Sequence, residues 1–184
     1  MNRFYTRAGD DGYTGLLGKG RTAKYDPRLE AVGTLDEATA ALGMVRANCR
    51  DPRTTPLVLT AQRDLYNLMA EVAATAENAA RFRTIDATRV AWLEDQIDAL
   101  SQVVNLPREF IVPGDSSAGA ALDLARTVVR RAERRVAFLL HNKEIENVEL
   151  LHYLNRLSSM CFVLELLENQ TAGTSSPTLA KTTP

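Results

Sequence analysis

Cysteine, histidine and aromatic residues are all scarce in this chain of 184 residues. It contains two cysteines, two histidines and 6% aromatic residues. Cys49 and Cys161 lie in different apolar patterns and share no spacing motif, which argues against a disulfide framework and against a cysteine–histidine metal cluster. We therefore expect both to be reduced, structural thiols of a cytoplasmic protein.

The chain also lacks a charge excess of either sign and lacks long apolar runs. Its 22 Lys and Arg against 23 Asp and Glu give a net charge of −1, which argues against a nucleic-acid partner. No run of about 18 apolar residues occurs, so we expect no membrane-spanning segment and no membrane partner. The N-terminal residues show neither the apolar core nor the small-residue cleavage site of a secretory signal.

The remaining composition is that of a globular chain. Hydrophobic residues make up 45% and charged residues 24%, which is enough apolar material to bury one core. We place this single domain at residues 1–168. Residues 169–184 are mostly Thr, Ser, Pro and Ala, and we expect them to form a flexible tail.

Apolar residues recur at three- and four-residue spacing from Leu29 onward, which predicts helices. Five are expected, over about 29–45, 56–72, 86–104, 116–140 and 145–168. The last is apolar almost all round, as is typical of a helix in the middle of a bundle or in a subunit interface. The predicted fold is all-α: a five-helix bundle behind a glycine-rich N-terminal loop.

The N-terminal segment, residues 1–28, holds half of the ten glycines and is predicted to be irregular. From Thr6 to Gly15, glycines recur every third residue beside hydroxyl groups and Arg7. Glycine lets successive backbone N–H groups turn inward around a phosphate, and Asp10 or Asp11 would help to hold Mg²⁺ between phosphates. The stretch is neither a Walker A motif nor a dinucleotide fingerprint, so it predicts only a phosphate-binding loop. Lys24 is either a further phosphate contact or an ordinary surface lysine.

The fourth predicted helix carries charged residues where its core face should lie. On a helical wheel centred on Val129, Glu133 and Arg126 fall within the apolar face and Arg130 at its edge, whereas Arg131 points to the opposite side. Like charges four residues apart repel, and one glutamate cannot neutralise the row. The row is either a structural salt-bridge network or a site for an outside anion such as a polyphosphate.

Two further polar residues fall among apolar neighbours. Asp36 shares the predicted stripe of Leu35 and Thr39, and a buried aspartate needs a cation. Arg126 is its natural partner, within one subunit or across an interface. Asn155 is either a hydrogen-bonded structural amide or part of the same site.

Other chemistries find little support. Glu149 and His152 have the spacing of a di-iron ligand pair, but the second pair that such a site needs is missing. No nucleophile elbow of a Ser-His-Asp hydrolase is present.

Five segments, in this order, resemble the PduO-type ATP:cob(I)alamin adenosyltransferases. They are YTRAGDDGYTGLL (5–17), EAVGTLDE (30–37), FIVPG (110–114), ARTVVRRAERR (125–135) and YLNRLS (153–158). The resemblance implies a homotrimer of five-helix bundles with active sites between subunits. It also implies transfer of the 5′-deoxyadenosyl group of ATP, bound with Mg²⁺, to the cobalt of the co-substrate cob(I)alamin, with release of triphosphate. A flavoprotein reductase and an adenosylcobalamin-dependent mutase are the partners that this reaction implies.

The resemblance also assigns residues by position. The ATP-binding positions are Thr6, Arg7, Ala8, Gly9, Thr14, Gly15, Lys24, Arg130, Arg131, Ala132, Glu133, Arg134 and Asn155. The residues expected to carry catalysis are Arg130, Phe110, Asp36 and Arg126: Phe110 packs under the corrin ring, and Asp36 pairs with Arg126 of a neighbouring subunit. The chain departs from the usual pattern at Ala8, Asp115 and Ser159.

Three alternatives remain open from the sequence. In the first, the chain is a delivery protein or sensor that binds ATP and cobalamin with little turnover. In the second, it is a bundle with a purely structural Arg–Asp network. In the third, it is an ATPase that releases phosphate.

Overall fold

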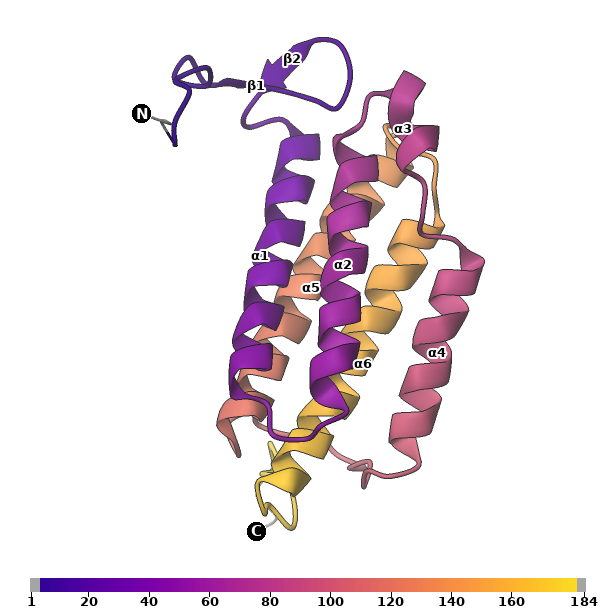
Figure 1. Cartoon of the computed structure of the whole chain (residues 1–184). Helices are drawn as coiled ribbons and strands as arrows, with labels where there is room; N and C mark the ends of the chain where they lie inside the picture. Colours follow the sequence, from indigo (N-terminus) through magenta and orange to yellow (C-terminus); the bar gives the residue numbers. More distant parts are fainter. Residues whose placement is uncertain (1–3, 182–184) are drawn as a thin grey trace.

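The computed structural model describes residues 4–181; residues 1–3 of the N-terminal segment and 182–184 of the tail lie outside the described part. The chain begins with a small antiparallel hairpin and continues as helices (Figure 1). The elements are β1 (Tyr13–Gly15), β2 (Arg21–Ala23), α1 (Pro27–Asn48), α2 (Thr54–Ala73), α3 (Ala76–Phe82), α4 (Ala87–Ser101), α5 (Ser117–His141) and α6 (Glu149–Thr171).

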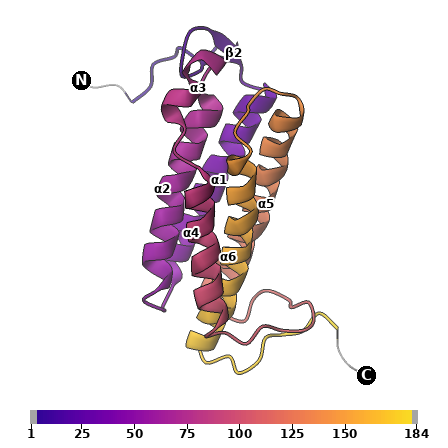
Figure 2. The same cartoon turned by 90° about the vertical axis from the view of Figure 1, so that its right-hand side faces the viewer.

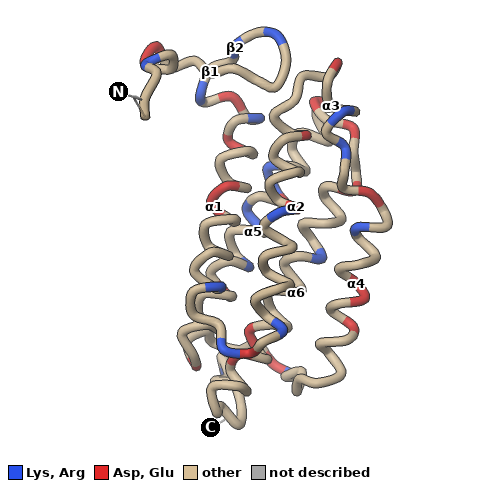
Figure 3. Tube along the Cα trace, in the orientation of Figure 1, with Lys and Arg blue, Asp and Glu red and all other residues tan. Residues whose placement is uncertain are grey.

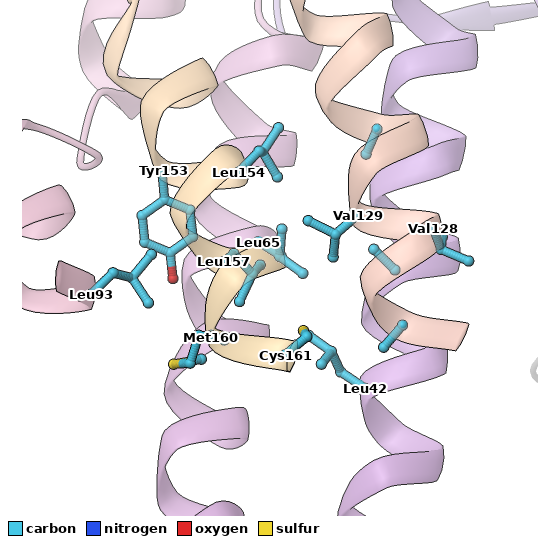
Figure 4. Close-up of a cluster of buried hydrophobic side chains, with 14 of the residues drawn as sticks. Leu42, Leu65, Leu93, Val128, Val129, Tyr153, Leu154, Leu157, Met160 and Cys161 are labelled. Atoms are coloured by element: carbon cyan, nitrogen blue, oxygen red, sulfur yellow. The ribbon is translucent and has the colours of Figure 1, made fainter. Parts of the chain in front are cut away.

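The five long helices run roughly alongside one another. α5 packs against both α1 and α6, α1 also packs against α2, and α4 packs against α6 (Figures 1 and 2). Their apolar faces meet in one core, where Leu42 of α1, Leu65 of α2, Leu93 of α4 and Val129 of α5 surround Leu157 of α6 (Figure 4). All five side chains are fully buried. The helical core predicted from apolar spacing is confirmed.

Three helices begin at side-chain caps. The carboxylate of Asp26 accepts from the backbone N–H of Arg28, with Pro27 as the first residue of α1. Asp86 and Ser116 cap α4 and α5 in the same way, as their positions in the sequence indicated. Capping satisfies N–H groups that have no partner inside the helix and so fixes where each helix starts.

The prediction of five helices is one short, because α3 was missed. This helix has seven residues and buries none of them, so it carries no apolar stripe that a periodicity argument could detect. The N-terminal segment is also more regular than predicted, since Tyr13 pairs with Ala23, Thr14 with Thr22 and Gly15 with Arg21.

The hairpin is attached to the bundle through Leu17. Its N–H donates to the carbonyl of Ala73 at 2.9 Å, and its carbonyl accepts from the N–H of Thr75 at 3.3 Å. Gly20 has a φ of +102° in the connection between the strands, a backbone conformation that favours glycine. The glycines of this segment therefore shape a hairpin that is fixed at the end of α2.

The tail, which the sequence predicted to be flexible, has defined contacts in its described part. Ile111 and Leu179 form an antiparallel bridge, so the tail returns to the segment between α4 and α5 (Figure 2). None of the helices among residues 4–181 has the length and apolar character needed to cross a membrane. Both cysteines are free thiols, and burial raises the pKa of Cys161 to about 12.

Glu165, on α6, is buried without a hydrogen-bond partner for either carboxylate oxygen among the described residues. Burial, together with the nearby Asp123 and against the opposing effect of Arg126, raises its pKa to about 7. An acid of this kind is tolerated in its neutral form and destabilises the fold when it ionises.

We predict that Glu165→Gln stabilises the protein at pH 8 and leaves its stability nearly unchanged at pH 4.5. In the unfolded chain this carboxyl loses its proton near its ordinary pKa of 4.5, whereas in the folded chain it does so only near pH 7. The folded state therefore loses stability as the pH rises through this window, by up to about 3 kcal/mol, and stays level above it. Urea unfolding at several pH values measures the difference.

Glu168→Gln is the matched control on the same helix. The Glu168 carboxylate accepts from the N–H groups of Arg50 and Asp51, at 2.9 and 3.2 Å, and from the hydroxyl of Thr54 at 2.5 Å. Because this carboxylate is fully bonded, its amide variant should lose stability at pH 8. A Glu165 variant that behaves like the Glu168 variant would contradict the argument.

Candidate active site

The hairpin and the residues before it form a compact loop held by one arginine. The guanidinium of Arg21 donates to both carboxylate oxygens of Asp11 at 2.8 Å, to the carbonyl of Ala8 at 2.6 Å and to that of Tyr13 at 2.9 Å. The hydrogen bonds from Arg21 hold the pKa of Asp11 below its usual range. The sequence reasoning did not anticipate this role of Arg21, because its partners come from three separate positions, two of them backbone carbonyls.

The turn at residues 7–12 is closed by its own backbone hydrogen bonds. Arg7 has a φ of +59° and Gly12 a φ of +81°, and the N–H of Gly12 donates to the carbonyl of Gly9 at 3.2 Å. The N–H of Asp10 likewise donates to the carbonyl of Arg7 at 3.2 Å, so these backbone donors are used within the turn, and the phosphate-binding role of the loop stays a prediction. The side chains of Thr6, Arg7 and Lys24 and the small Ala8 are exposed here.

Gly9 brings Lys24 into this loop. A Cβ at Gly9 would lie 2.8 Å from the Lys24 ammonium nitrogen, so the absent side chain makes room for the lysine tip. Thr14 and Gly15 follow in β1, so the structure gathers the seven N-terminal residues assigned to ATP in one region.

The arginines of α5 divide into two groups. Arg131 pairs with Glu37 and Arg135 with Glu30 at 3.4 Å, both across to α1, whose trace carries acidic positions (Figure 3). The guanidinium of Arg130 contacts no acceptor within residues 4–181. Arg134 is exposed and donates to the backbone carbonyl of Arg130 at 3.0 Å. Arg131 and Arg135 thus have protein counter-charges, while Arg130 is free to bind an outside anion.

Glu133 and Asn155 meet between α5 and α6, a contact that is compatible with both the structural and the site interpretation of Asn155. The side-chain amide of Asn155 donates to the Glu133 carboxylate at 2.9 Å and accepts from Arg156 at 2.8 Å. Arg156 in turn binds Glu94 of α4 at 2.8 Å. Both Glu133 and Asn155 are half-buried, whereas Ala132 faces the core.

The predicted place of Asp36 in the buried stripe of α1 is wrong. Its neighbour Leu35 is fully buried, but Asp36 is exposed and Val32 only half-buried, so the wheel was centred on the wrong residue. Arg126 pairs instead with Asp123, one turn away on α5, at 2.6 Å. Within one chain, Asp36 and Arg126 are not in contact.

Phe110 lies on a cavity and not in the core. Its side chain is 87% exposed, which excludes the plain packing role. The cavity wall includes Phe110, Ile111, Asp123, Arg126 and Phe162. The structure therefore joins Phe110 and Arg126, which lie far apart in sequence, at one site.

The two predicted halves of the site lie at opposite ends of one bundle. The hairpin stands beyond the start of α1, and the segment that joins α4 to α5 lies at the other end (Figure 1). α1 spans most of this separation, about 33 Å for its 22 residues. No single small molecule reaches both segments of the same chain.

Comparison with known proteins assigns most of the chain to one family. Residues 4–168 match the family described as Cobalamin adenosyltransferase. The chain belongs to the cobalamin adenosyltransferase family. This adenosyltransferase chain is 37% identical to the corrinoid adenosyltransferase of Bacillus subtilis (strain 168), over 93% of its own length and 89% of the relative's.

A further relative and a solved structure are similar to this chain, which spans only part of the length of that relative. Identity to the corrinoid adenosyltransferase PduO of Citrobacter freundii is 40% over 91% of this chain, which spans about half (50%) of that relative. A solved structure of a variant PduO-type ATP:corrinoid adenosyltransferase from Lactobacillus reuteri, complexed with cobalamin and ATP, aligns with a TM-score of 0.89. It is 30% identical and covers 98% of this adenosyltransferase chain and 100% of the L. reuteri chain.

Proposed function

We propose that this chain transfers the 5′-deoxyadenosyl group of ATP to the cobalt of cob(I)alamin, producing adenosylcobalamin and triphosphate. The family membership of residues 4–168 supports the reaction class. The observation in the structure that carries the proposal is Arg130, an exposed arginine without a protein acceptor among the described residues, beside the bonded pair Glu133–Asn155. A cation left unpaired next to an ordered amide suits a nucleotide phosphate.

The reaction needs charge stabilisation and positioning but no proton transfer. The cobalt(I) electron pair attacks C5′ of ATP, the Co–C bond forms as the C5′–O bond breaks, and the bonding electrons leave with triphosphate. Cobalt(I) is a strong nucleophile, so no general base is required. The protein's part is to hold the two reactants in line and to neutralise the departing anion.

The assigned ATP-binding residues take roles in this scheme, except Ala132, whose side chain is fully buried in the core. Arg7, Lys24 and Arg130 balance the triphosphate, and the backbone of Ala8, Gly9, Thr14 and Gly15 with the hydroxyl of Thr6 contacts the phosphates. Glu133 holds the amide of Asn155, which fixes the nucleotide, while Arg131 already pairs with Glu37 and Arg134 donates to the carbonyl of Arg130. Mg²⁺ enters with ATP on its phosphate oxygens and lowers their charge. Of the two acids in the loop, Asp11 is bound to Arg21, which leaves Asp10 to assist.

We propose that the working site lies between subunits of a homotrimer. The opposite placement of the hairpin and the α4–α5 segment supports this arrangement, because a neighbouring chain brings its own hairpin to α5. Exposed Met44 of α1 with Leu124 and Phe138 of α5 provide apolar surface for such an interface. In it, Asp36 of one subunit pairs with Arg126 of the next.

Phe110 serves the reduction that precedes transfer. An exposed aromatic ring on a cavity shared with Arg126 is suited to pack below the corrin ring and to exclude the lower axial ligand. Cobalt(II) without that ligand accepts an electron more easily, because cobalt(I) prefers four coordination. A flavoprotein reductase as electron donor and an adenosylcobalamin-dependent mutase as receiver are the proposed partners.

The decisive experiment is anaerobic incubation of the protein with chemically reduced cob(I)alamin and MgATP. We expect adenosylcobalamin, followed by absorbance, with an equimolar amount of triphosphate. Orthophosphate as the product would assign an ATPase. Tight ATP binding without turnover would overturn the proposal in favour of a delivery protein or sensor.

Arg130→Ala should lower kcat/KM with cob(I)alamin by about 10- to 100-fold, the usual effect of losing one charge-assisted contact to phosphate. The fold should persist, because the guanidinium binds no acceptor among residues 4–181. Arg135→Ala is the control on the same helix, since Arg135 pairs with Glu30 at the surface and should matter less than twofold. Equal losses in the two variants would count against a phosphate role for Arg130.

Asp36→Asn should weaken trimer assembly, ATP affinity or both by about tenfold or more, because it leaves Arg126 of the neighbouring subunit without its counter-charge. Sedimentation over a range of concentrations and ATP titration measure the two effects. Glu30→Gln, six residues earlier on α1, is the control. If both the assembly and the ATP affinity are unchanged, the proposed pairing of Asp36 with Arg126 is wrong.

A further inference from the structure

The tail is hydrogen-bonded to the backbone of the segment that carries Phe110. The N–H of Val112 donates to the carbonyl of Thr178 at 2.8 Å, and the N–H of Ala180 donates to the carbonyl of Phe110 at 2.8 Å. These bonds flank the bridge between Ile111 and Leu179. Because the Phe110 ring itself is exposed, its position depends on how this backbone is held.

Asp115 holds the tail a second time, through its side chain. One carboxylate oxygen accepts from the N–H of Thr178 at 2.9 Å and the other from the Thr178 hydroxyl at 2.6 Å. The N–H, the hydroxyl and the carbonyl of Thr178 are therefore all hydrogen-bonded to residues 112–115. The hydrogen bonds from Thr178 lower the pKa of Asp115, so the carboxylate stays charged at neutral pH.

The place of Asp115 in the chain makes this contact an anchor. It directly precedes Ser116, whose hydroxyl caps α5, so the carboxylate is attached to the start of a long helix. Gly114, with a φ of +132°, turns the chain just before it. A pair of strands this short is only marginally stable when backbone hydrogen bonds alone hold it. The charge-assisted bonds between Asp115 and Thr178, here called the clip, attach the tail to a rigid helix end and decide whether the pairing persists.

We infer that Asp115 is a positioning residue: through Thr178 it holds residues 178–180 against 110–112 and thereby sets the place of the Phe110 ring below the corrin. The inference rests on the proposed function of Phe110. A ring that displaces the lower axial ligand must resist that ligand's return. With the clip intact, the Phe110 backbone is tied to α5, on which Arg126 lines the same cavity.

The test compares Asp115→Ala and Thr178→Val with the unchanged chain in two assays. One starts from cob(II)alamin with a reductant and MgATP, and the other from chemically pre-reduced cob(I)alamin and MgATP. We expect each variant to lose about tenfold in the first assay and less than twofold in the second. Electron paramagnetic resonance of bound cob(II)alamin with MgATP should show a smaller four-coordinate fraction, in the same direction as for Phe110→Ala.

Controls separate the clip from other effects. Ser176→Ala changes the tail at an exposed residue whose hydroxyl makes no hydrogen bond within residues 4–181, and it should behave like the unchanged chain. Thr178→Val guards against damage to α5, since it leaves the helix start intact. The double variant should lose no more than either single variant, because both remove the same contact.

Several outcomes would overturn the inference. Equal losses in both assays would mean that the clip serves binding or stability, and unchanged spectra with unchanged rates would mean that it does not position Phe110. Failure of the unchanged chain to turn over cob(I)alamin would instead refute the proposed function itself.

Discussion

The division of α5 into an apolar face and a charged edge is the constraint on which the rest of the structure depends. Val129, Ala132 and Val136 are fully buried against α1 and α6, while Arg130 and Arg134, set on the same turns, stay exposed. Burial of the apolar face fixes the rotation of the helix, and that rotation decides where every arginine points. The site is therefore oriented by the core, through packing that touches no ligand.

Much of this was predictable because it is local. Apolar spacing located the five long helices, capping residues located the starts of α4 and α5, and the wheel placed Glu133 near the core, where it meets Asn155. The errors have other causes. α3 buries nothing and has no periodic signal, Asp36 was misplaced by one position of a weakly amphipathic helix, and the bonds of Arg21 and Thr178 join segments distant in sequence.

The opposite placement of the hairpin and the Phe110 segment is a chemical reason for the proposed assembly. A single bundle carries the glycine-rich hairpin at one end and the cavity of Phe110 at the other, with a row of arginines between them. Two reactants must meet within bonding distance, so contributions from adjacent chains are the economical solution. Asp36, exposed on one chain, and Arg126, bonded only within its own helix, are then the groups that an interface would bring together.

The location of the strongly perturbed ionisable groups fits a reaction without proton transfer. Burial raises the pKa of Glu165, of Cys161 and of Tyr153, whose hydroxyl donates to Asp64 at 2.6 Å. All three are buried side chains of α6 and none belongs to the N-terminal loop, although Arg126 is near enough to lower the pKa of Glu165 and of Cys161. General acids and bases need tuned pKa values beside the substrate, whereas attack by cobalt(I) needs aligned reactants and fixed cations. The chain places the side chains with raised pKa values in the core and its exposed arginines at the surface. This separation suits a reaction in which a metal nucleophile displaces an anionic leaving group without proton transfer.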